Sequence, residues 1–151
     1  MEETKRTIEE LVNKTGFDIN EIKFCEEDGG LWCCIKTTDS SLMIGNSGET
    51  LSAINFITRR MLEAKNKDKE VEFIIDVNDY QKKRIDNLKT KAHMMAERAR
   101  FFKASIEIEP MSGYERRVIH KYLDGQPDIK TESAGFGRNR HIVIKYISNS
   151  L

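Results

Sequence analysis

Basic side chains spaced four residues apart are the groups in this sequence best suited to bind an anion. Arg116 and His120 have this spacing and therefore project from one side of a helix. Arg117 and Lys121 repeat it one position further on. Guanidinium groups donate paired hydrogen bonds to phosphate, and an imidazole can donate another or stack on a base. The spacing predicts a helical surface that holds a single-stranded nucleic acid.

Two more arginines, Arg138 and Arg140, follow a loop that contains two glycines. A strand beside the helix would add their charge to the same surface, together with that of His141 and Lys145. For His120 a second interpretation stays open. A half-buried imidazole that is hydrogen-bonded to a backbone carbonyl would stabilise the fold and would contact no ligand.

A glycine turn between two expected helices is the second candidate binding site. Gly45 and Gly48 flank Asn46 and Ser47, and such a turn lets the backbone come close to a ligand. The unpaired N–H groups at the start of the following helix favour an anion. Because neither central residue is charged, we expect only a weak grip on phosphate.

The composition excludes a membrane protein and points to the cytoplasm. The chain has 151 residues, of which 38% are hydrophobic and 33% charged. No apolar run approaches the roughly 20 residues that span a bilayer, and the acidic start Met1-Glu2-Glu3 is unlike a signal peptide. We expect a cytoplasmic protein without membrane insertion.

The cysteines and histidines suggest neither a metal site nor a catalytic centre. Cys25, Cys33 and Cys34 cannot pair evenly, and all three histidines lie far downstream of them, so we expect reduced thiols in a pair of strands. No nucleophile, base and metal ligands converge on one cleft. The sequence predicts no catalytic residue, no bound metal, no cofactor and no enzyme activity.

The net charge of zero hides an asymmetry between the two halves. Residues 1–78 contain 10 Lys and Arg against 16 Asp and Glu, a net charge of −6. Residues 79–151 contain 15 against 9, a net charge of +6. The second half therefore suits a polyanion, and the division predicts two domains, 1–78 and 79–151.

The periodicity of apolar residues predicts an α+β protein. In residues 1–78 the expected order is α-β-β-α-α-β: a helix opened by a capping box at Thr7–Glu10, a hairpin from Ile22 to Ile35 that turns at 28–30, a short segment at 40–44, a helix from Glu49, a loop at 65–70 and a strand at 71–77. In residues 79–151 it is α-β-α-β-β: a long helix from Tyr80 to Arg100, a strand at 104–108, a helix opened by a second capping box at Ser112–Glu115, and strands at 129–133 and 142–146.

Two segments resemble known nucleic-acid-binding domains. The stretch from Leu42 to Leu51 resembles the signature of a KH domain in its bacterial, type II arrangement. In that family the G-x-x-G loop clamps the backbone of about four single-stranded nucleotides. The run from Pro110 to His120, with 131–135 and 138–144 after it, resembles the R-3-H domain, which is named for an arginine and a histidine separated by three residues. Arg116 and His120 match that pair.

A KH-like unit followed by an R-3-H unit resembles the bacterial Jag family, also called SpoIIIJ-associated or KhpB proteins. The resemblance implies an RNA-binding regulator that is linked to cell elongation, division or sporulation. It also implies a partner, a second and smaller KH-domain protein. Single-stranded DNA is a further candidate ligand, and a homodimer is a further candidate assembly.

A different class of function stays open beside RNA binding. The acidic first half is compatible with a KH-shaped fold that mainly contacts protein. On this interpretation the chain is a protein-interaction module with little affinity for RNA. Both interpretations hold together if the acidic half contacts protein and the basic half contacts RNA.

Overall fold

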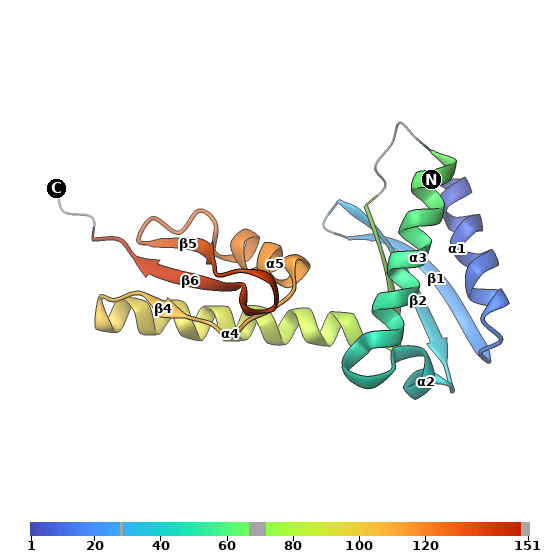
Figure 1. The fold of residues 1–151 in the computed structure, drawn as a ribbon, viewed down its shortest axis with the longest axis horizontal. Coiled ribbons are helices and arrows are strands. Elements are labelled where there is room, and N and C mark those ends of the chain that lie inside the picture. The colour runs from blue at the N-terminus through green and yellow to red at the C-terminus, as the bar shows by residue number, and fades with distance from the viewer. Residues whose placement is uncertain (28, 67–71, 149–151) are drawn as a thin grey trace. The chain divides into compact units, whose positions relative to one another are not determined.

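The computed structural model describes residues 1–27, 29–66 and 72–148, and these form two compact units, Met1–Lys82 and Lys83–Leu151. Each unit has its own three-stranded sheet and its own hydrophobic core, so the chain is a mixed α+β protein as predicted (Figure 1). Asp28 of the expected hairpin turn, and residues 67–71 of the expected loop and strand, lie outside the described residues.

The first unit contains a β-hairpin and a helical crossover. Its elements are α1 (Glu2–Lys14), β1 (Ile19–Glu27), β2 (Gly30–Thr37), α2 (Ser40–Ile44), a 3-10 turn (Asn46–Gly48), α3 (Glu49–Lys65) and β3 (Phe73–Val77). β1 pairs antiparallel with β2, and β2 pairs parallel with β3. A parallel pair needs a crossover connection, and α2 and α3 supply it.

Helices α1 and α3 cover one face of this sheet (Figure 1). The residues that share this core are Ile8, Val12, Leu31, Cys33, Ile35, Met43, Leu51, Ile54, Leu62, Phe73, Ile75 and Val77. The capping box expected at Thr7 is wrong, because α1 begins at Glu2 and its N-cap is Met1. Thr7 is only 2% exposed and lies beside Ile8 on the buried face of the helix.

An amide side chain joins α3 to β3, the edge strand of this sheet. Asn55 Oδ1 accepts a hydrogen bond of 2.8 Å from the backbone N–H of Ile75, and Nδ2 donates one of 2.9 Å to its carbonyl. An edge strand presents unpaired backbone groups, and Asn55 satisfies both groups of Ile75. This contact fixes the position of α3 along the sheet and, with it, the glycine turn that precedes α3.

A sharp break separates β3 from the long helix α4 (Tyr80–Phe102). Asn78 and Asp79 both have positive φ, at 48° and 61°, so the backbone turns sharply between the strand and the helix. The buried Asp76 carboxylate then accepts hydrogen bonds from the backbone N–H groups of Gln81 (2.7 Å) and Lys82 (3.2 Å). Burial raises the pKa of Asp76, and these N–H groups oppose that rise. The carboxylate thus satisfies the first turn of α4.

The three cysteines occupy the strand pair, as expected, and all are free thiols. Cys33 is fully buried in the core, and burial raises the pKa of its thiol to about 12. Cys34 faces the other side of the sheet, with its Sγ 4.0 Å from that of Cys25. Burial raises the pKa of Cys34 to about 11, so the neutral thiol predominates at neutral pH.

The second unit packs α4 and α5 (Gly113–Leu123) against an antiparallel sheet. Its strands are β4 (Ile106–Glu107), β5 (Ile129–Ala134) and β6 (His141–Tyr146), in the order β4-β6-β5. The core consists of Ala92, Ala96, Ala99, Ile108, Ile119, Leu123, Ile129, Ile142 and Ile144. The alanines recur along one side of α4, where small side chains permit close packing.

The glycine turn of the first unit requires glycine at both ends. Gly45 has φ 75° and ψ −174°, a backbone region that essentially only glycine occupies, and a Cβ there would lie 2.3 Å from Thr50 Oγ1. Gly48 has φ 84°, and a Cβ there would lie 3.0 Å from Cε1 of Tyr80. The turn therefore packs closely against Thr50 of α3 and against Tyr80 at the start of α4.

Replacing Gly45 by alanine tests this requirement. We expect Gly45→Ala to lower the free energy of unfolding of the first unit by about 3 kcal/mol, because backbone strain and steric overlap add together. Gly16→Ala is the matched control: it also has positive φ (77°), but nothing lies within 4 Å of the added Cβ. Gly16→Ala should lower the free energy of unfolding by roughly 1 kcal/mol. Urea unfolding followed by the fluorescence of Trp32 measures both, and equal losses would contradict the steric argument.

Candidate nucleic-acid interface

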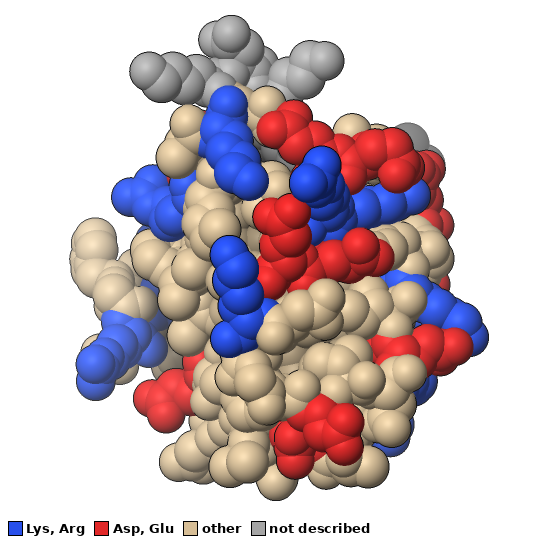
Figure 2. Space-filling view, turned by 90° about the vertical axis from the view of Figure 1, so that its right-hand side faces the viewer, with Lys and Arg blue, Asp and Glu red and all other residues tan. Residues whose placement is uncertain are grey.

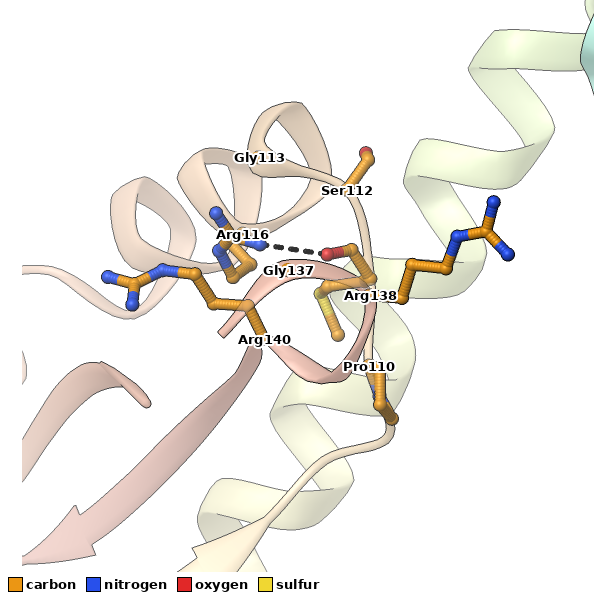
Figure 3. A pocket seen from close by; sticks show the side chains of 8 residues that line it. Pro110, Ser112, Gly113, Arg116, Gly137, Arg138 and Arg140 are labelled. Atoms are coloured by element: carbon orange, nitrogen blue, oxygen red, sulfur yellow. Dashed lines mark hydrogen bonds between the residues drawn. The ribbon is translucent and has the colours of Figure 1, made fainter. Parts of the chain in front are cut away.

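A pocket of about 540 Å³ lies at the start of α5 in the second unit (Figure 3). It is formed where the segment before α5 meets the loop between β5 and β6. Its lining residues are Pro110, Met111, Ser112, Gly113, Arg116, Gly137, Arg138 and Arg140. A backbone hydrogen bond of 3.2 Å from Met111 N–H to the Arg140 carbonyl joins the two segments.

The start of α5 is fixed by the predicted capping box. The Ser112 hydroxyl accepts a hydrogen bond of 3.3 Å from the Glu115 backbone, and the Glu115 carboxylate accepts one of 2.9 Å from the Ser112 backbone. Glu115 also accepts a hydrogen bond of 2.6 Å from Arg84 Nε on α4. The helix therefore begins at a defined point, and that point lines the pocket.

Three arginines surround this pocket, and the backbone positions two of them. Arg116 Nη1 donates to the Met111 carbonyl at 2.9 Å, and Arg140 Nη1 donates to the Gly135 carbonyl at 2.9 Å. Each guanidinium keeps further N–H donors for a ligand. In Figure 3 the side chains of Arg138 and Arg140 point away from one another, with Arg116 between them. Among the described residues, no acceptor is found for Arg138.

His120 lies one helical turn after Arg116 and faces β5. Its Nδ1 is 2.6 Å from the hydroxyl of Thr131, and its Nε2 is 3.1 Å from the hydroxyl of Ser133. Burial lowers the pKa of His120, and the nearby charge of Arg116 lowers it further. Both ring nitrogens thus have partners within the fold, and these are side-chain hydroxyls where the sequence suggested a backbone carbonyl. Whether a ligand also contacts this imidazole stays a prediction.

The other basic residues of this unit lie away from the pocket lining. Arg117 and Lys121 are exposed on the outer side of α5, next to the row that carries Arg116. On β6, alternation turns Lys145 to the opposite face of the sheet from the buried Ile144, where it forms an ion pair of 2.6 Å with Glu132. Lys145 is therefore paired with an acidic side chain and does not line the pocket, and whether it adds charge to the arginine surface stays a prediction.

In the first unit, the two central residues of the glycine turn are exposed. Asn46 and Ser47 form the 3-10 turn, and Ser47 has a positive φ of 53°. Gly48 is buried, and Glu49 places a carboxylate in the first turn of α3. The face seen in Figure 2 carries acidic and basic side chains interspersed, without a continuous basic area. Any anion held at this turn would depend mainly on backbone N–H groups.

In the part of the chain that the structure describes, no group of three or more His, Cys, Asp and Glu side chains is placed to hold a metal ion. None of the helices in these residues is both long and apolar enough to cross a bilayer.

The sequence did not single out some residues that border the arginines. Met111 and Gly137 line the pocket, and Phe136 stands in the adjacent loop with 91% of its surface exposed. Only one signal in the sequence pointed to Phe136, its place between two glycines just before the arginines. That signal says nothing about whether the ring is buried.

Comparison with known proteins gives one family match and several similar proteins. Residues 86–146 match the family model of the R-3-H domain. The chain is 36% identical over 109 residues to the RNA-binding protein KhpB of Bacillus subtilis, a match that covers 71% of this chain and 52% of that protein. It is 30% identical over 110 residues to the RNA-binding protein KhpB of Clostridium symbiosum, covering 73% and 49%.

The protein of the same name from Streptococcus pneumoniae is 30% identical over 111 residues, covering 73% of this chain and 33% of that protein. The matched region thus spans about half the length, or less, of these curated relatives. The R-3-H match includes all of α5, β5 and β6, and therefore the whole arginine pocket.

The lowered pKa of His120 predicts a pH dependence of stability. The folded protein binds this proton less tightly than the unfolded chain, whose pKa is near 6.5. The resulting contribution to stability is complete above about pH 6.5 and is lost as the pH falls through the folded pKa. We expect His120→Gln to lose less stability than wild type between about pH 8 and pH 5.

Urea unfolding followed by circular dichroism at both pH values measures this difference. His93→Gln is the matched control, because it removes an imidazole that is exposed on α4. If the stability of His120→Gln depends on pH in the same way as that of wild type, protonation of His120 does not destabilise the fold.

Proposed function

We propose that this chain, which matches the R-3-H domain over residues 86–146, is a member of the KhpB family and a regulatory protein that binds single-stranded RNA. The observation that carries the proposal is the pocket at the start of α5, which Arg116, Arg138 and Arg140 line. Guanidinium groups there can donate paired hydrogen bonds to phosphate oxygens. The names of the relatives support RNA as the ligand, and single-stranded DNA is the alternative polyanion.

The proposed contacts on this unit extend from the pocket along α5. Arg116, Arg138 and Arg140 bind phosphate, and Arg117 and Lys121 add charge on the neighbouring side of the helix. His120 orients this surface through Thr131 and Ser133, and contacts the ligand if its imidazole is displaced from a hydroxyl. Phosphate contacts of this kind position a strand and contribute little to the choice of sequence.

The first unit is proposed to be a KH-like domain of type II, with the boundary to the R-3-H domain near residue 78. Its order of elements and its parallel pair of strands around α2 and α3 support this assignment. The glycine turn, Gly45 to Gly48, would then contact the RNA backbone through its N–H groups. With Asn46 and Ser47 at its centre, its contribution to affinity should be small.

We further propose a cytoplasmic binding protein that catalyses no reaction itself. A role in cell elongation, division or sporulation comes from the family resemblance alone. The names of the relatives describe binding, and this supports a function through complex formation with RNA.

A salt titration of Arg138→Ala tests the pocket. The probe is a fluorescently labelled oligouridine of about 12 nucleotides, within the usual site size of single-strand binders. We expect roughly tenfold weaker binding, because one charge-assisted hydrogen bond is lost. The slope of log K against log salt should become shallower by about 0.7, which is one phosphate contact.

Arg98→Ala is the matched control, since it removes an exposed arginine from α4 outside the pocket lining. Equal effects of the two substitutions would mean that general charge, and not the pocket, attracts the strand. Absence of binding by wild type at low salt would reject the proposed function.

A second candidate function, protein interaction, is favoured by an exposed apolar stripe on α3. Phe56 is 62% exposed, Ile57 50% and Met61 36%, and none of these three residues of α3 belongs to the core of the unit. Contiguous exposed apolar side chains often mark a contact with another protein. We propose that this stripe binds a second KH domain, either that of a smaller KH protein or that of another copy of this chain.

Replacing Ile57 by lysine tests this contact. We expect Ile57→Lys to weaken the association by roughly tenfold or more, because a charge would be buried at the centre of the interface. Asn13→Lys is the control, as Asn13 is exposed on α1 and not on α3. Sedimentation velocity of the chain alone, and mixed with a single-domain bacterial KH protein, measures both assemblies. If wild type forms a complex and Ile57→Lys forms it equally well, the stripe is not the binding surface.

A further inference from the structure

Phe136 is the most exposed of the large apolar side chains that the structure describes, at 91% of its surface. Its loop is nevertheless held in one conformation by hydrogen bonds. The Arg140 guanidinium donates to the Gly135 carbonyl at 2.9 Å, and Asn139 N–H donates to the Phe136 carbonyl at 3.1 Å. The exposure of the ring is therefore a feature of an ordered turn.

The glycines on either side make this turn possible. Gly135 has φ 83°, and a Cβ there would lie 2.7 Å from the Asn139 carbonyl oxygen. Gly137 has φ 55° and lines the arginine pocket. The chain thus passes close to itself beside Phe136, and the ring remains outside the fold.

The same turn carries the cations of the pocket. Arg138 and Arg140 follow Phe136 by two and four residues, and both line the pocket. An aromatic face and two guanidinium groups therefore come from one short segment. Proteins that bind single strands combine these two features: cations along the backbone, and aromatic rings on which bases stack.

The surroundings of Phe136 favour a base over an apolar protein surface. Its neighbours along the loop are glycine, arginine and asparagine, which add no large apolar side chain next to the ring in the sequence. Docking of a protein usually needs a cluster of apolar side chains, whereas one ring is enough to stack one base.

We propose that Phe136 is a stacking platform for an unpaired base, and that a phosphate adjacent to this base lies in the pocket of Arg116, Arg138 and Arg140. The proposal rests on the proposed function of RNA binding and adds a selectivity to it. In a duplex both faces of a base are covered by its neighbours, so Phe136 can stack only on a base of a single strand or at an end. The platform thus selects a single strand over a duplex, and the arginines hold the backbone of that strand.

Three substitutions of the full chain separate stacking from other roles of the ring. We expect Phe136→Ala and Phe136→Leu to bind labelled oligouridine roughly tenfold more weakly than wild type, since both lack an aromatic face. Phe136→Tyr should bind like wild type. With an oligonucleotide of the same length whose sugars carry no bases, wild type and Phe136→Ala should bind equally. Unfolding curves check that each variant keeps its fold.

Each other result overturns the proposal in a distinguishable way. If wild type binds oligouridine and Phe136→Ala binds it equally well, the platform is wrong and the RNA-binding function stands. If Phe136→Leu retains the affinity, the ring makes an apolar contact and not a stack. If wild type binds no RNA at low salt, the proposed function fails, and the platform fails with it.

A fluorescent variant gives a readout that does not depend on affinity. Phe136→Trp adds an exposed indole to a chain whose single natural tryptophan, Trp32, is buried. Stacking of a base should quench the added emission on titration with oligouridine, and the oligonucleotide without bases should leave it unchanged. Equal quenching by both probes would contradict stacking.

Discussion

The proposed binding surface depends on one buried carboxylate, that of Glu115. It is only 8% exposed, and it accepts hydrogen bonds from the Ser112 backbone and from Arg84 on α4. Burying a carboxylate is unfavourable unless its partners replace the lost water. The two contacts do so only when the start of α5 lies against α4 in this one arrangement. The position of the helix start, and with it the pocket, follows from this requirement.

From that fixed point, backbone carbonyls orient the arginines. The carbonyl of Met111, just before α5, accepts from Arg116, and the carbonyl of Gly135 accepts from Arg140. A long flexible side chain loses conformational entropy when it binds a ligand, and a side chain that is already held loses less. The fold has thus ordered two guanidinium groups in advance, whereas Arg138 is left to adapt to the strand.

The sequence predicted those elements whose cause is local. The capping box at Ser112 and Glu115 was correct, since its two hydrogen bonds join residues only three apart. The similar prediction at Thr7 was wrong. Thr7 faces the core together with Ile8, and the helix that carries both residues begins earlier, at Glu2. Helical spacing placed Arg116 with His120, but it could not tell which side of α5 would face β5. Likewise, the exposure of Phe136 depends on how the chain from Gly135 to Arg140 closes on itself, which composition does not specify.

The charge count of the second half, a net of +6, does not say where on the fold a ligand would meet that charge. Several of its cations are neutralised within the fold, in the pairs Arg84–Glu115, Lys91–Glu109, Arg100–Asp128 and Lys145–Glu132. Among the described residues, no acidic partner is found for Arg116, Arg138 or Arg140, and these three line one pocket. The proposed phosphate contacts are therefore few, with Arg117 and Lys121 adding charge beside them on α5. Since each phosphate contact releases about one counterion, a surface of this kind gives a shallow salt dependence, and selectivity must come from groups that recognise something other than charge.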